Sequence, residues 1–236
     1  MAWGIGVMVA VMIGFYWLSI VWKGYLPTPM IDPIIIKSMA RYSAGNYIAE
    51  IFFNLPRFIL PLMIINFVST ESTGYFFIAL MVAGMLYAIP QSISSSFLAE
   101  SSINGELWPN VKKSIKLNIA LILPGILTFI VFGKFVLNLF NPLYAENAST
   151  TLVILAIASL PFSVNTLFMA VRNAQKKVES VVKINTAIAS ITLVLAFPLM
   201  ESMGIEGAAL AYFTANSLAA IVVIYKMKKT LISKYI

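Results

Sequence analysis

The sequence predicts an all-α integral membrane protein with about seven transmembrane helices, one helix followed by a six-helix bundle. Hydrophobic residues make up 60% of the 236-residue chain and charged residues only 11%, with a mean hydropathy of +0.91. Soluble domains carry about 25% charged residues, and a soluble core of this size cannot bury so much apolar surface. In a bilayer, apolar helices of about 20 residues can place this apolar surface against lipid.

Several apolar runs of this length follow one another along the chain. The first lacks a basic leading segment and a small-residue cleavage site, so it is interpreted as a span and not as a signal peptide. The predicted spans are 3–22, 44–68, 73–98, 115–137, 152–171, 181–200 and 207–225. The domains expected from them are a helix at 1–22, an amphipathic cytoplasmic linker at 23–43, a six-helix bundle at 44–225 and a basic tail at 226–236.

The basic residues are distributed unevenly among the connections. Of the 16 lysines and arginines, all except Arg57 and Lys134 lie in every second connection or in the tail. Short cytoplasmic loops retain lysine and arginine. The asymmetry predicts a multi-pass protein of the cell membrane with its N-terminus outside and its C-terminus in the cytoplasm. The net charge of +7 is therefore interpreted as a topology signal, and no nucleic acid is expected as a partner.

The residues that are missing exclude several chemistries. The chain contains no cysteine and no histidine, so the usual ligands of zinc, haem and iron–sulfur clusters are absent. Ser-His and Cys-His nucleophiles are excluded as well. Four acids expected on the cytoplasmic side are scattered without pairing: Asp32, Glu100, Glu106 and Glu179. We therefore expect neither an enzyme nor a cofactor.

The span at 44–68 has a polar stripe, formed by Asn46, Glu50, Asn54 and Arg57. At 100° per residue these four positions fall within a quarter-turn. Placing an ionisable group at mid-span makes the free energy of membrane insertion less favourable by roughly 2.5–3.5 kcal/mol, so such a group is a candidate for function. We predict that the stripe lines a watery substrate cavity; the alternative is a structural Arg57–Glu50 pair. The apolar positions assigned to other faces are Phe52, Phe53, Ile59 and Leu62.

A second polar line runs along the span at 73–98, at Gly84, Tyr87, Gln91 and Ser94. Tyr87 and Gln91 join the candidate substrate-binding residues. Small and polar residues in the later spans are predicted mainly to pack closely and to hydrogen-bond between helices. They include Asn165, Asn185 and Asn216. Prolines near the middle of several spans are typical of the broken helices that surround transporter sites.

Three stretches of the chain resemble a known transporter family. They are Asn54-Leu-Pro-Arg57 through Ile89-Pro90, Leu160-Pro161-Phe through Ala174-Gln-Lys-Lys177, and Gly204-Ile-Glu-Gly207-Ala-Ala-Leu-Ala211. In order and spacing they are similar to the C-terminal six-helix bundle of polysaccharide flippases. These flippases are a branch of the multidrug/oligosaccharidyl-lipid/polysaccharide (MOP, MATE-like) exporter superfamily.

The resemblance implies a flippase that moves a polyprenyl- or dolichyl-diphosphate-linked oligosaccharide across the membrane for glycan biosynthesis. It implies that Arg57 contacts the diphosphate and that the asparagines and Gln91 contact sugars. Family members usually have two such bundles. The chain is therefore expected to be a fragment or a half-transporter whose partner is an N-terminal half, with membrane lipids around both.

Other functions remain open at this point. A multidrug or cation antiporter of the same superfamily would need carboxylates deep in its helices, and only Glu50 qualifies. A non-transporting membrane subunit would bury the polar stripe in an interface with its partner. A membrane-embedded glycosyltransferase or acyltransferase usually shows acidic pairs or histidines, which this sequence does not contain.

Overall fold

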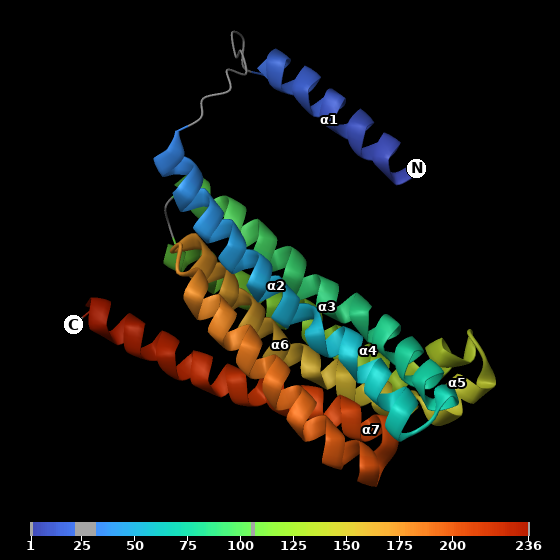
Figure 1. Ribbon diagram of the computed structural model, residues 1–236. Helices are drawn as coiled ribbons and strands as arrows, with labels where there is room; N and C mark the ends of the chain where they lie inside the picture. Colours follow the sequence, from blue (N-terminus) through green and yellow to red (C-terminus); the bar gives the residue numbers. More distant parts are fainter. Residues whose placement is uncertain (1, 22–31, 105–106, 236) are drawn as a thin grey trace. The chain divides into compact units, whose positions relative to one another are not determined.

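The chain is helical almost throughout (Figure 1), as the composition predicts. The computed structural model describes residues 2–21, 32–104 and 107–235, and no strand occurs in these ranges. Six of the helices are long and apolar enough to cross a membrane. The helices are α1 (Ala2–Val21), α2 (Pro33–Phe67), α3 (Thr70–Asn104), α4 (Leu107–Asn138), α5 (Pro142–Asn147), α6 (Ser149–Ala174) and α7 (Val178–Tyr235).

Helix α7 is a hairpin of two legs that meet at Gly204. As one straight helix its 58 residues would extend about 87 Å, whereas the hydrocarbon core of a bilayer is about 30 Å thick. Gly204 has φ 58° and ψ −132°, outside the helical region. Figure 1 shows the chain turning back there, and Ile188 of the first leg packs in one cluster with Ala215 of the second. The two legs correspond to the last two predicted spans.

The chain divides into two compact units, Met1–Ala40 and Arg41–Ile236. In the first unit, residues 4–21 of α1 are exposed on every side. A helix that is apolar all round needs lipid or other protein around it. Its composition and length are therefore those of a membrane span.

Helix α2 begins at Pro33 and not at residue 44, so the C-terminal part of the predicted linker is helical. The Ile35 N–H donates to Oδ1 of Asp32 at 3.4 Å, which is the geometry of an N-cap. Proline is well tolerated at the first helical position, because its missing N–H has no partner there anyway. Residues 23–31 of the predicted linker lie outside the described ranges.

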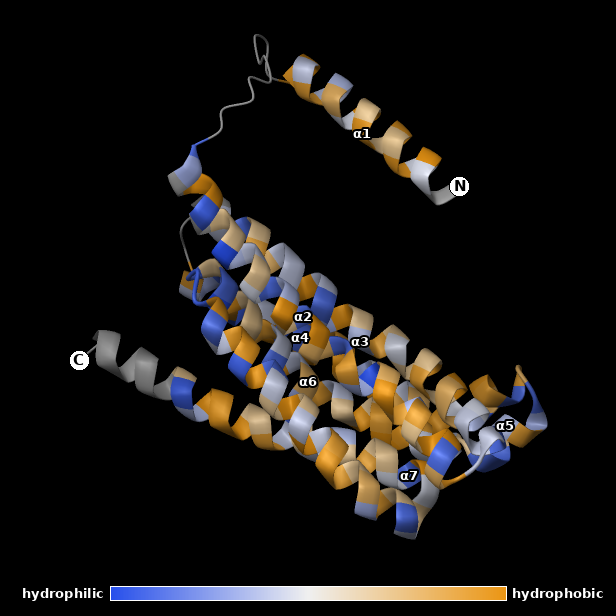
Figure 2. Cartoon of the chain, in the orientation of Figure 1, coloured by the Kyte–Doolittle hydropathy of each residue, from blue (hydrophilic) through white to orange (hydrophobic). Residues whose placement is uncertain are grey.

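Helix α6 forms the centre of the second unit. Of its apolar window 67% is buried, against 17% for α4, and it packs against α3, α4 and α7. The main core lies between these helices and α2, and includes Ile64, Phe76, Leu152 and Ala208. The other helices carry large exposed apolar side chains, such as Phe58, Met85 and Phe135, and Figure 2 shows that apolar residues predominate along the long helices.

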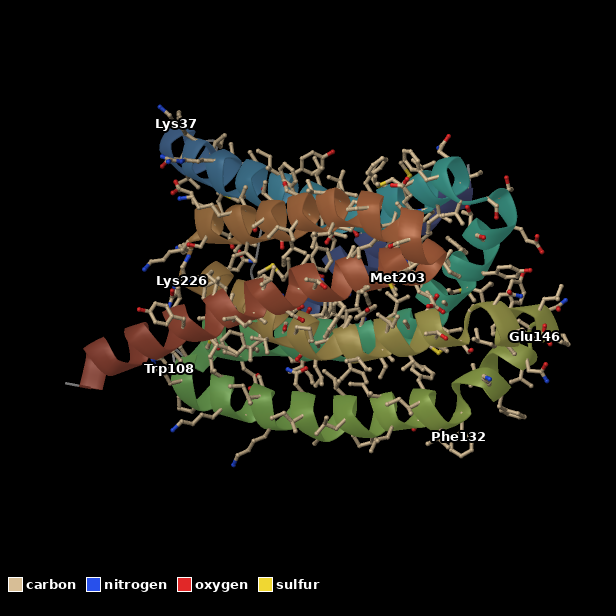
Figure 3. All side chains as sticks on the ribbon, turned by 90° about the horizontal axis from the view of Figure 1, so that it is seen from below. Lys37, Trp108, Phe132, Glu146, Met203 and Lys226 are labelled. Carbon is tan, nitrogen blue, oxygen red and sulfur yellow. The ribbon has the colours of Figure 1, made fainter. Side chains whose placement is uncertain are left out.

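The two ends of the second unit differ in charge. Figure 3 shows Trp108 and Lys226 at one end, and Met203 and Glu146 at the other. At the first end, Lys113 of α4 pairs with Glu100 of α3 at 3.0 Å. Successive helices run antiparallel, so the basic connections of this unit collect there. This is the separation of charge on which the predicted topology depends.

The hairpin in α7 generates a test. A Cβ at Gly207 would lie against the backbone of Leu199 and Met200 in the opposite leg. We expect Gly207→Ala to push the legs apart and to lower the free energy of unfolding by about 1–3 kcal/mol. The matched control is Gly74→Ala in α3, where the added Cβ meets nothing within 4 Å. Thermal denaturation of both purified variants checks this, and equal midpoints would contradict it.

Candidate functional site

The C-terminal half of α2 combines polar side chains with two internal prolines. Pro56 and Pro61 both lie inside the helix. Proline has no N–H, so Pro61 cannot donate to the carbonyl of Arg57, four residues earlier. The helix therefore presents an additional backbone acceptor beside the arginine. Such groups are tolerated at membrane depth where they face protein or a water-filled cavity.

A pocket of about 450 Å³ lies against this part of α2, a volume in the range of ligand sites. We call it the arginine pocket. Its polar lining comes from Asn54 and Arg57 of α2 and from Tyr87 and Gln91 of α3. Arg57 is exposed and forms no hydrogen bond or ion pair with any residue in the described ranges. Its guanidinium group is thus available to a ligand.

A second pocket, of about 310 Å³, lies further toward the start of α2. We call it the glutamate pocket. Phe53 and Gln91 line both pockets, so the two are adjacent and form one groove along α2 and α3. Its polar lining comes from four helices and includes Asn46, Glu50, Gln91, Ser94, Asn173 and Asn185. All six of the predicted substrate-binding residues therefore lie along the groove.

The two charged residues of the stripe do not pair with each other. Asn54 Nδ2 donates to Oε1 of Glu50 at 2.7 Å and to the Glu50 carbonyl at 3.0 Å. No ion pair joins Glu50 to Arg57 in the described part of the chain. Seven helical residues separate them by about 10 Å along the axis. The alternative of a locking Arg57–Glu50 pair is therefore not what the structure contains.

Tyr87 contributes its ring to the arginine pocket. The residue is only 7% exposed, and its hydroxyl donates to the carbonyl of Leu155 in α6 at 2.7 Å. Its ring centroid lies 4.8 Å from that of Phe162 and 6.0 Å from that of Tyr212. The hydroxyl is committed to holding α3 against α6, so Tyr87 forms an aromatic wall and leaves polar recognition to its neighbours.

The prediction that the later polar residues bond between helices is confirmed for three asparagines. Asn165 of α6 donates to the carbonyl of Asn216 in the second leg of α7 at 2.9 Å. Asn185 in the first leg donates to the carbonyl of Ala49 in α2 at 2.9 Å. These bonds fix α2 and both legs of α7 around α6. Asn185 also lines the glutamate pocket, so it has a place in the groove as well.

One position was assigned to the wrong face, and several lining residues were missed. Phe53 lines both pockets, because seven residues after Asn46 it has completed almost two turns and returned to the polar side. Asn173 and Tyr212 also line the groove. Neither belongs to a periodic polar pattern, so only the packing of α6 and α7 against α2 reveals them.

The comparisons with known proteins identify no relative of this chain. No family model, no curated protein and no solved structure matches the chain. The function is therefore inferred from the geometry of the groove and from the resemblance of the sequence motifs.

The groove can be tested for water, and the absence of native cysteines makes single-cysteine labelling direct. We expect Asn54→Cys and Gly84→Cys to react with a charged methanethiosulfonate reagent at least about tenfold faster than Phe58→Cys, because only thiolates in water react readily. Positions 54 and 84 line the arginine pocket. Phe58 is 66% exposed on α2 and does not line it. Labelling rates in intact membranes provide the measurement. Equal rates at all three positions would contradict a water-filled groove.

Proposed function

We propose that this chain is one half of a multi-pass membrane flippase that translocates lipid-linked oligosaccharides through their diphosphate head group. The observation that carries the proposal is Arg57. Its exposed guanidinium group has no hydrogen-bond or ion-pair partner among the described residues. It lines a pocket against the C-terminal half of a membrane-length helix, about 15 Å along the axis from the helix end at Phe67. An arginine at this depth without a ligand or an ion-pair partner is costly, which favours a role in binding.

The chemistry of arginine supports an anionic ligand with several oxygens. A guanidinium group binds phosphate through two parallel, charge-assisted hydrogen bonds. The arginine pocket contains no acidic residue in its lining, so nothing there competes for the guanidinium. Asn54 and Gln91 add amide groups beside it. These features fit a diphosphate, in agreement with the role that the family resemblance implies for Arg57.

The walls of the same pocket support a ligand with a hydrocarbon chain. Leu60, Phe76, Met81 and Met85 line it together with Arg57. Met85 is 65% exposed and Met81 is 43% exposed, so the apolar wall continues to the outer surface of α3. A prenyl chain attached to a bound diphosphate can therefore pass from the pocket to lipid without crossing polar surface.

The groove is open on one side, which supports a partner. Glu50, Arg57 and Gln91 are all exposed along α2 and α3, and none of the other helices described in the second unit covers them. Charged and amide groups at membrane depth need water or protein opposite them. We propose an N-terminal half-transporter on this face, in the cell membrane, with the basic end of the bundle toward the cytoplasm.

A cation or drug antiporter fits the groove less well. Within its described lining, Glu50 is the one carboxylate, and one of its oxygens already accepts a hydrogen bond from Asn54. The unpaired Arg57 would repel a cationic drug from the larger pocket.

The test is complementation of a flippase-deficient strain with this chain and a candidate N-terminal half. We expect Arg57→Ala to reduce surface glycan about ten- to a hundredfold, since hydrogen bonds to charged groups are the strong ones. Arg57→Lys should retain part of the activity because it keeps the charge and loses the bidentate geometry. Lys134→Ala is the control, because Lys134 is exposed and lies outside both pockets.

One result would change the role assigned to Arg57, and another would contradict the proposal. A loss of assembled protein pairs, with normal glycan per remaining pair, would make Arg57 an interface residue of a non-transporting subunit. Stable, inserted protein that restores no glycan in any combination would contradict the flippase proposal itself.

A further inference from the structure

The glutamate pocket contains hydrogen-bonding atoms that the protein does not satisfy. Ser94 Oγ, Asn173 Oδ1 and Asn185 Oδ1 are buried and have no hydrogen-bond partner among the described residues. All three residues line this pocket. Ser94 and Asn185 are only 6% and 4% exposed. Buried polar atoms in native proteins are nearly always paired, with protein, water or ligand. The two amide oxygens can only accept, and the Ser94 hydroxyl can accept or donate, so the pocket suits water or a ligand that donates hydrogen bonds.

Glu50 strengthens the acceptor character of the pocket. Asn54 donates to Oε1 of its carboxylate, and Oε2 has no hydrogen-bond or ion-pair partner among the described residues. The acceptors come from α2, α3, α6 and the first leg of α7. Asn185 is oriented by its own amide, which donates to the carbonyl of Ala49 at 2.9 Å. Its Oδ1 is therefore the atom left for a ligand.

The size of the pocket favours an organic group over a bare metal ion. A hard cation needs several oxygens converging within about 2.3–2.6 Å of one point. The glutamate pocket instead has a volume of about 310 Å³, at the lower end of the range for small organic ligands. No group of three or more acidic, histidine or cysteine side chains suited to a metal occurs in the described ranges. A ring with several hydroxyl or amide donors matches both the volume and the acceptors.

We infer that the glutamate pocket is a sugar subsite, which binds the first sugar residue attached to the diphosphate through its hydroxyl or amide hydrogens. This inference rests on the proposed function, since it places the diphosphate at Arg57. Gln91 lines both pockets and so lies at the junction between sugar and diphosphate. The separation of about 10 Å between Glu50 and Arg57 along the helix is comparable to one sugar ring joined to a diphosphate.

The experiment measures how much one sugar adds to binding by the purified chain in lipid nanodiscs. The probes are farnesyl diphosphate and farnesyl-diphospho-N-acetylglucosamine, titrated by calorimetry. We expect the sugar-bearing probe to bind about three- to tenfold more tightly to the wild type, the gain typical of one added hydrogen bond or a little more. Glu50→Gln and Ser94→Ala should each reduce this gain toward one. The gain is the ratio of the two affinities within each variant, so a change that affects both probes equally, such as the loss of the Glu50 charge near the diphosphate, cancels.

Matched controls separate the subsite from general effects. Glu71→Gln and Ser102→Ala make the same chemical changes outside both pockets and should keep the full gain. Arg57→Ala should weaken both probes by the same factor. If Arg57→Ala does so but the sugar adds nothing, or adds as much in Glu50→Gln and Ser94→Ala as in the wild type, the sugar subsite is wrong and the flippase proposal survives.

Further outcomes would contradict the proposed function itself, or would assign the pocket to a cation. If the wild type binds neither probe, or if Arg57→Ala changes neither affinity, the proposed function fails and the subsite fails with it. Thermal unfolding in sodium chloride against choline chloride provides a further arm. A stabilisation by sodium that disappears in Glu50→Gln but persists in Glu71→Gln would show that the pocket holds a cation, and would overturn the sugar assignment.

Discussion

The cost of holding an arginine at the depth of a membrane is the constraint on which the architecture depends. Insertion of such a group costs roughly 2.5–3.5 kcal/mol, and α2 includes no partner for it in the described chain. The helix tolerates Arg57 because the residue faces a groove in which α3 adds polar groups opposite it. Other apolar residues of α2, such as Phe58 and Leu62, face outward, whereas Leu60 and Ile64 pack in the core. One helix thus separates lipid from a polar interior.

Helix α6 holds the helices around the groove in position. It is the most buried of the long helices, and specific contacts attach it to α3, to α2 and to the second leg of α7. Tyr87 binds its Leu155 carbonyl, and Asn165 binds Asn216. Phe162 packs against Phe53 at 5.8 Å between ring centroids. Bonds of this kind position helices where apolar packing alone gives little directional preference. The groove wall is consequently fixed before any ligand arrives.

Much of the fold follows from the sequence, because hydropathy and loop charge report directly on membrane-length helices. The polar stripe of α2 was also predictable, since helical periodicity places Asn46, Glu50, Asn54 and Arg57 on one face whatever surrounds them. The early start of α2 at Pro33 and the short helix α5 were not predicted, because local caps at Asp32 and Asn141 decide them. Asn173 joins the site only through tertiary packing, which no single helix encodes.

The arrangement of charge in the groove also limits how a transport cycle can run under the proposed function. If a partner bundle closed over an empty groove, Arg57 would lose its water without gaining a counter-ion, and desolvating an unpaired charge is strongly unfavourable. A bound diphosphate removes that penalty by supplying the anion. Closure over the occupied groove is then more favourable than closure over the empty one, so the arginine that binds the head group also couples closure to the presence of ligand.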